Sequence, residues 1–165
     1  MKSKILVAGV GNIFLGDDAF GVEVAQRLAQ LQLPEGGSVI DFGIRSYDLA
    51  FALMSDWDLA ILVDALPRGG KPGTLYVMEP ELPGHERPQE IPDAHSMNPV
   101  AVLQLVYALG GRVRRLLVVG CEPGILEPTS NGNIGLSAPV EGALDEAVRL
   151  VEGLISRATD HAIAA

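Results

Sequence analysis

The chain has 165 residues, of which 48% are hydrophobic and 20% charged, so it can bury the core of one domain and is not expected to be disordered. A formal net charge of -9 makes nucleic acid and anionic membrane surfaces unfavourable partners, because both repel an acidic protein. The single cysteine, Cys121, excludes an intramolecular disulfide. No apolar run has the length of a membrane span or the cleavage pattern of a signal peptide, so a cytoplasmic protein is expected.

Predicted strands and helices alternate along the chain. In order they are a strand over 4–10, a helix over 19–31, a strand over 38–41, a helix over 47–55, strands over 59–63 and 74–78, a helix from 99, a strand over 115–120 and a final helix from 137. Uninterrupted apolar strands are typical of parallel sheets that are buried on both faces. We therefore predict an α/β fold with three layers, α/β/α, and a mostly parallel sheet. One domain is expected over 1–157, with a frayed tail over 158–165.

The stretch over 79–99 contains five prolines, which rule out regular structure across it. An ordered loop of that length in a small domain usually has a function. Its end predicts a helix start, with Asn98 as the cap and Pro99 at the first helical position.

Ligands of parallel α/β sheets bind beyond the carboxyl ends of the strands. That rule selects four loops, which are 11–18, 43–46, 64–70 and 121–136. Asp18 follows the first strand, Asp64 ends the third, and His95 lies in the proline-rich loop that leads back to this edge. Two carboxylates and one imidazole suit zinc, nickel or another borderline divalent ion.

The residues after the first strand favour a cation over a nucleotide. The glycines there lack the G-x-G-x-x-G spacing, and two acids stand where a pyrophosphate would bind.

Simpler roles remain open for the acids and the histidine. Asp17 is predicted to cap the first helix, where acids favour the helix dipole. Asp64 could instead accept backbone hydrogen bonds from the following turn, and His95 could be a solvated loop residue.

Cys121 ends the last strand at the same edge of the sheet. A thiol there could be a nucleophile if a base lowered its pKa, but no histidine lies near it in sequence, so a structural role is predicted. Glu122 and Glu127 are expected to line the rim of the site.

The chain contains six motif segments within about 4–156, in the order 7–13, 16–22, 62–65, 92–96, 119–123 and 135–137. In combination, these segments resemble the nickel–iron hydrogenase maturation proteases. The resemblance implies a monomeric endopeptidase that trims the C-terminal extension from a hydrogenase large-subunit precursor after nickel insertion. It also implies a five-stranded mixed sheet whose antiparallel strand is 74–78. The acid, acid and histidine that contact the metal in the family correspond to Asp18, Asp64 and His95.

The chain departs from the family pattern in two places. The family often has glutamate at the position of Asp18, and it often has a glycine–threonine turn where this chain has residues 42–46. Arg45 in that turn either binds a carboxylate of the substrate tail or is a solvated rim charge. Asn12 and Arg45 are the predicted substrate-binding residues.

Two mechanisms follow from the resemblance. Either the three ligands recognise nickel already held by the precursor, or a bound metal generates a hydroxide nucleophile. The chain lacks H-E-x-x-H, so no resident catalytic zinc is expected, and the first mechanism is preferred. Asp18 or Asp64 would then assist water attack, as in an aspartyl-type endopeptidase. The alternatives are a non-hydrolytic nickel-binding accessory protein and a small-molecule enzyme that uses Cys121.

Overall fold

The computed structural model describes residues 3–82, 98–128 and 135–163, and five strands in this part form one sheet. The strands are β1 (Ile5–Val10), β2 (Gly37–Gly43), β3 (Leu59–Ala65), β4 (Leu75–Met78) and β5 (Leu116–Cys121). Their order is β2-β1-β3-β5-β4, and all neighbours are parallel except β4, which runs antiparallel to β5. The predicted mixed sheet, with its antiparallel strand at 74–78, is confirmed.

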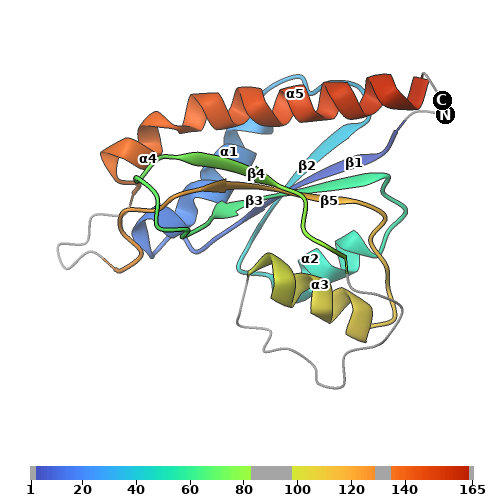
Figure 1. Ribbon diagram of the computed structural model, residues 1–165, viewed down its shortest axis with the longest axis horizontal. Coiled ribbons are helices and arrows are strands. Elements are labelled where there is room, and N and C mark those ends of the chain that lie inside the picture. Colours follow the sequence, from blue (N-terminus) through green and yellow to red (C-terminus); the bar gives the residue numbers. More distant parts are fainter. Residues whose placement is uncertain (1–2, 83–97, 129–134, 164–165) are drawn as a thin grey trace.

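Helices cover both faces of the sheet (Figure 1). They are the 3-10 turn η1 (Gly16–Ala19), α1 (Phe20–Leu28), α2 (Ser46–Leu53), α3 (Pro99–Ala108), α4 (Ala138–Gly142) and α5 (Leu144–Ile163). The helices α1 and α5 lie on one face, and α2 and α3 lie on the other. In the described part of the chain, none of these helices has both the length and the hydrophobicity that crossing a bilayer requires.

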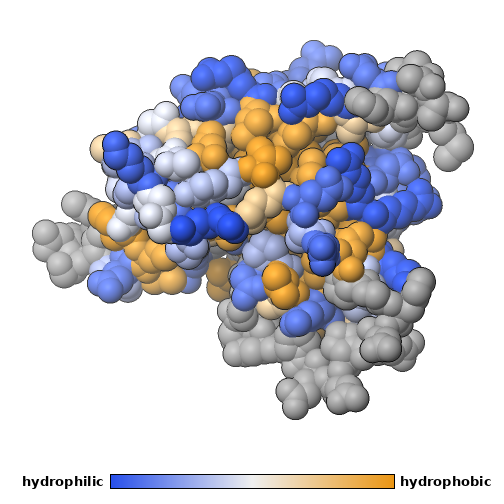
Figure 2. Space-filling view, viewed as in Figure 1, coloured by the Kyte–Doolittle hydropathy of each residue, from blue (hydrophilic) through white to orange (hydrophobic). Residues whose placement is uncertain are grey.

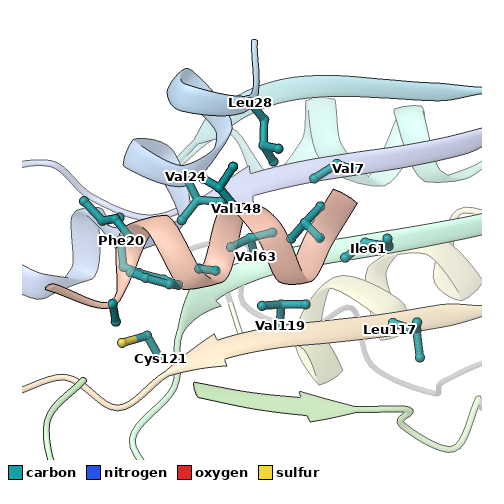
Figure 3. Packing of buried hydrophobic residues seen from close by; sticks show 14 of the residues in the cluster. Val7, Phe20, Val24, Leu28, Ile61, Val63, Leu117, Val119, Cys121 and Val148 are labelled. Atoms are coloured by element: carbon teal, nitrogen blue, oxygen red, sulfur yellow. The ribbon is translucent and has the colours of Figure 1, made fainter. Parts of the chain in front are cut away.

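The core consists of two apolar clusters, one on each face of the sheet. Successive side chains of a strand point to opposite faces, so β1 places Val7 against α1 and α5 and Leu6 against α2 and α3. In β3, Ile61 belongs to the cluster under α1 and α5, and Leu62 belongs to the cluster under α2 and α3. Figure 3 shows the cluster under α1 and α5. The central strands are buried on both faces, which explains their uninterrupted apolar sequences.

The helix boundaries follow local chemistry. Asn98 caps α3 as predicted, because its side chain accepts a hydrogen bond from the N–H of Ala101 at 2.8 Å. The first helix ends at Leu28, so Leu31 is exposed and does not continue the buried stripe.

The final helical segment is divided in two. The short α4 ends at Gly142, and α5 then continues to Ile163, beyond Ala158, where the sequence predicts the start of a frayed tail. The Thr159 hydroxyl donates to the carbonyl of Glu35 at 3.1 Å, which attaches this end of α5 to the turn before β2. Hydrophilic residues cover the outer side of α5, and hydrophobic residues lie beneath it (Figure 2).

The parallel strands all end on one side of the sheet, at the left of Figure 1. The loops after β1, β3 and β5 meet there, as expected for an open parallel sheet.

Candidate functional site

Asp18 and Asp64 lie close together at the carboxyl edge of the sheet. Asp18 belongs to η1, which follows β1, and Asp64 is part of the neighbouring strand β3. Asp64 is only 8% exposed, whereas Asp18 is half-buried. Burial raises the pKa of Asp64 well above its usual range, and the negative charge of Asp18 raises it further, while the N–H of Ala65 offsets part of the effect. A cation bound to both carboxylates would remove this penalty.

The predicted third ligand, His95, lies outside the described residues. Within residues 3–82, 98–128 and 135–163, no three His, Cys, Asp or Glu side chains form a group that could hold a metal ion. The described donors are therefore two carboxylates, which fit a divalent cation that brings other ligands of its own.

The loop after β1 closes on itself and directs Asp18. The Asp18 carboxylate accepts the N–H of Asn12 at 2.8 Å, and the Asn12 side chain accepts the N–H of Phe14 at 2.9 Å. Gly11 has φ 148°, and a Cβ there would collide with the backbone carbonyl of Asp18, so the close approach requires glycine. Asn12 thus shapes the loop, and its contact with substrate stays a prediction.

The prediction that Asp17 caps the first helix is wrong. Its carboxylate is fully buried and accepts the N–H groups of Gly124 at 2.7 Å, Ile125 at 2.8 Å and Ser137 at 2.6 Å, and the Ser137 hydroxyl at 2.8 Å. Burial alone would raise the pKa of Asp17, but these hydrogen bonds outweigh it and the pKa is lowered. The physical reason is that Asp17 lies within η1, and Ala19 is the residue at the cap position of α1. The Asp17 side chain therefore faces the segment after β5.

Glu122 is buried, at 5% exposure, and does not line the rim as predicted. Its carboxylate accepts the N–H groups of Arg68 at 2.8 Å and Gly69 at 3.1 Å, and the hydroxyl of Tyr76 at 3.0 Å. Burial opposes ionisation, but the hydrogen bonds dominate and the pKa of Glu122 is lowered. The residue therefore anchors the loop that follows Asp64. Its position directly after the buried strand β5 was the sequence signal that could have identified it.

Cys121 is buried in the cluster beneath α1 and α5 (Figure 3). Burial raises the pKa of its thiol to about 11, and the nearby charges of Asp17 and Glu122 also raise it, against a lowering by the N–H of Gly73. A thiol that is inaccessible and protonated at neutral pH is a poor nucleophile, in agreement with a structural role.

A groove of about 370 Å³ lies beside the loop that holds Asp18. It is lined by residues 11–14 and 41–45 together with Val22 and Gln26. Three large apolar side chains of these segments are exposed, namely Ile13 by 42%, Phe14 by 66% and Ile44 by 63%.

Arg45, the second predicted substrate-binding residue, also lines this groove. Its guanidinium donates to the carbonyl of Phe42 at 3.1 Å and to the carbonyl of Asp41, and it pairs with Asp48 at 3.4 Å. The side chain is nevertheless 57% exposed, so one side of the guanidinium faces solvent.

Comparison of the sequence and fold with known proteins identifies the family of this chain. The family model described as hydrogenase maturation protease matches residues 22–154. The hydrogenase 2 maturation protease of Escherichia coli is 31% identical over 157 residues, covering 90% of this chain and 88% of that protein. The coenzyme F420 hydrogenase subunit delta of Methanothermobacter thermautotrophicus is 30% identical, covering 90% and 92%. The solved structure of the hydrogenase maturating endopeptidase HybD from Escherichia coli superposes with a TM-score of 0.70 at 29% identity, covering 94% of this chain and 93% of that one. The chain therefore belongs to the hydrogenase maturation protease family and is a peptidase.

Proposed function

We propose that this protein removes the C-terminal extension of a nickel–iron hydrogenase large-subunit precursor, and that it acts once the precursor holds nickel. The observation that supports this most directly is the pairing of Asp18 with Asp64. The pKa of Asp64 is raised by burial and by Asp18, and none of the groups that shift this pKa is a cation. Such a pair favours a ligand that brings positive charge.

Nickel enters this proposal as part of the substrate. A nickel ion already bound to the precursor would take Asp18 and Asp64 as oxygen ligands and His95 as a nitrogen ligand, a mixed set that borderline ions accept. A precursor without nickel would leave the two carboxylates uncompensated. The difference in binding free energy between the two precursors would thus delay cleavage until metal insertion is complete.

Hydrolysis needs a group that takes a proton from the attacking water. We assign this step to Asp18 or Asp64, because a carboxylate oxygen at the carboxyl edge of the sheet can accept that proton. The proton would then pass to the leaving amine as the peptide bond breaks.

The groove beside Asp18 supplies a place for the precursor's tail. Ile13, Phe14 and Ile44 offer apolar contact to an extended segment, and the exposed side of Arg45 is available to a tail carboxylate. Asn12 joins the groove to the site, because its N–H bonds to Asp18.

Incubation with nickel-loaded and nickel-free precursor, followed by mass spectrometry of the product, tests the proposal. We expect loss of the C-terminal extension from the loaded precursor alone. Equal cleavage of both would contradict nickel recognition, and no cleavage of either would contradict the proposed function. Size-exclusion chromatography of the free protein should give a monomer.

A second candidate is a non-hydrolytic accessory protein that binds the same partner. It is favoured by one observation, that a relative with 30% identity is named a hydrogenase subunit. The same experiment separates the two, because an accessory protein would form a complex and leave the precursor's mass unchanged.

A further inference from the structure

We propose that Asp17 is a positioning residue, which holds Asp18 beside Asp64 by fastening η1 to the segment that follows β5. This inference rests on the proposed function, in that it assigns Asp17 a part in setting the reaction site.

The hydrogen bonds of Asp17 join parts of the chain that are far apart in sequence. Its carboxylate accepts from Gly124, Ile125 and Ser137, and its own N–H donates to the carbonyl of Ile125 at 2.7 Å. Gly16, with φ 58°, would place a Cβ 2.8 Å from that same carbonyl, so the turn and the segment are in direct backbone contact. One residue thus docks η1 through five hydrogen bonds.

Among the described residues, Asp18 has no comparable long-range anchor. In the part of the chain that the structure describes, its carboxylate accepts from Asn12 and its N–H donates to Leu15, both within the same loop. The position of Asp18 relative to Asp64 therefore depends on how η1 is docked, and Asp17 is the adjacent residue in that four-residue turn.

The arrangement requires a carboxylate at position 17. Four donor groups converge on its two carboxylate oxygens. An asparagine would offer one oxygen acceptor, and its NH₂ group would face the donors of the other oxygen without accepting from them. Asp17→Asn should therefore loosen the docking while keeping the side chain's shape. Ser137→Ala removes only the hydroxyl donor and should act in the same direction more weakly, whereas Ser137→Thr keeps the hydroxyl.

The test compares these variants with Ile155→Val, a core truncation in α5 that packs near Gly37 at the opposite end of the sheet. The first readout is cleavage of nickel-loaded precursor. We expect Asp17→Asn to lower kcat about tenfold or more with little change in KM, Ser137→Ala to lower it less, and Ser137→Thr to be close to wild type. Ile155→Val should keep the wild-type kcat.

The second readout is hydrogen exchange at the amide of Asn12, which donates to Asp18. Exchange should quicken in Asp17→Asn and not in Ile155→Val, whether or not precursor is cleaved. If Asp17→Asn and Ser137→Ala leave both kcat and Asn12 exchange as in Ile155→Val, the inference is wrong. If the wild-type protein cleaves nothing, the proposed function fails and the exchange measurement still decides the role of Asp17. Should Asp17→Asn not fold, Ser137→Ala and Ser137→Thr decide both readouts.

Discussion

Two groups of acidic residues lie at the carboxyl edge of the sheet, and they differ in the hydrogen bonds that they accept and in the direction of their pKa shifts. Asp17 and Glu122 are buried, accept several hydrogen bonds each, and have pKa values below their usual range. Asp64 is also buried, but its pKa is raised well above its usual range by burial and by Asp18. A buried charge is tolerated where it is compensated, so Asp17 and Glu122 hold the loops as ionised acids. Among the described residues no cation offsets the charge of the Asp18–Asp64 pair, which is why we propose this pair as the ligand's place; we refer to it below as the uncompensated pair.

Asp17 and Glu122 each connect a different pair of segments. Asp17 reaches forward to the segment after β5, while Glu122, at the end of β5, reaches back to the loop after β3. The turn that carries Asp18 and the loop that follows Asp64 are therefore both fastened to β5 and its continuation. This is how residues from distant parts of the sequence come to present a single site.

Neutralising the uncompensated pair should have the largest effect. Asp64→Asn keeps the side chain's shape and removes its charge, and we expect cleavage of nickel-loaded precursor to fall by about 10²–10⁴-fold, the range of general acid–base contributions. The melting temperature should stay level or rise, because a costly buried charge is lost. Activity is measured by product mass and folding by circular dichroism.

Asp18→Asn and His95→Ala extend this test to the whole predicted ligand set. If the three side chains act as one unit, a double variant should be little worse than the poorer single one. His95→Ala should weaken Ni²⁺ more than Mg²⁺, because only the former favours a nitrogen ligand. Small, independent effects on cleavage would show that these residues are bystanders.

The sequence predicts the placement of Asp18 and Asp64 better than that of Asp17 and Glu122, for a physical reason. Asp18 and Asp64 follow from the positions of apolar strands and the rule that ligands bind beyond their carboxyl ends. The partners of Asp17 lie more than a hundred residues away, at Gly124 and Ser137, and no local pattern encodes that pairing. Local propensity instead favoured a helix cap, which tertiary hydrogen bonds override. The three layers and the mostly parallel sheet were predictable because burial on both faces is visible in the apolar strand sequences, whereas the strand order β2-β1-β3-β5-β4 comes from the structure.

The groove can be tested through Phe14, the most exposed of its large apolar side chains. Phe14→Ser should raise KM for precursor about tenfold, because the variant has no aromatic ring to pack against the tail, and should leave the melting temperature unchanged. Phe51→Ser is the matched control, since Phe51 is 57% exposed on α2 and does not line the groove. An equal effect of both variants on KM would remove the groove from the proposed tail-binding site.

The contribution of Glu122 to the stability of the native state should depend on pH. Its pKa is lowered on folding, so its ionised form stabilises the native state above the unfolded pKa, and this contribution is lost as pH falls through the folded value. Glu122→Gln should lower the melting temperature by several degrees near pH 7, with the difference from wild type shrinking below about pH 4. Glu127→Gln, at an exposed position nearby, should change little at either pH. A difference for Glu122→Gln that is constant with pH would contradict the role of its charge.

The smallest effect on cleavage is expected at Cys121, whose thiol lies near Asp17 and Glu122. Its thiol is buried and has a pKa of about 11, so at pH 8 the native protein should resist iodoacetamide, and the reaction should appear only on unfolding. Cys121→Ala should process precursor within a few-fold of wild type and lose some stability, because it removes a buried sulfur from the cluster beneath α1 and α5. Mass spectrometry of the alkylated protein and the cleavage assay check the two expectations. Rapid alkylation of the native protein, coupled to loss of cleavage, would restore the thiol-enzyme alternative that the buried position of the sulfur now opposes.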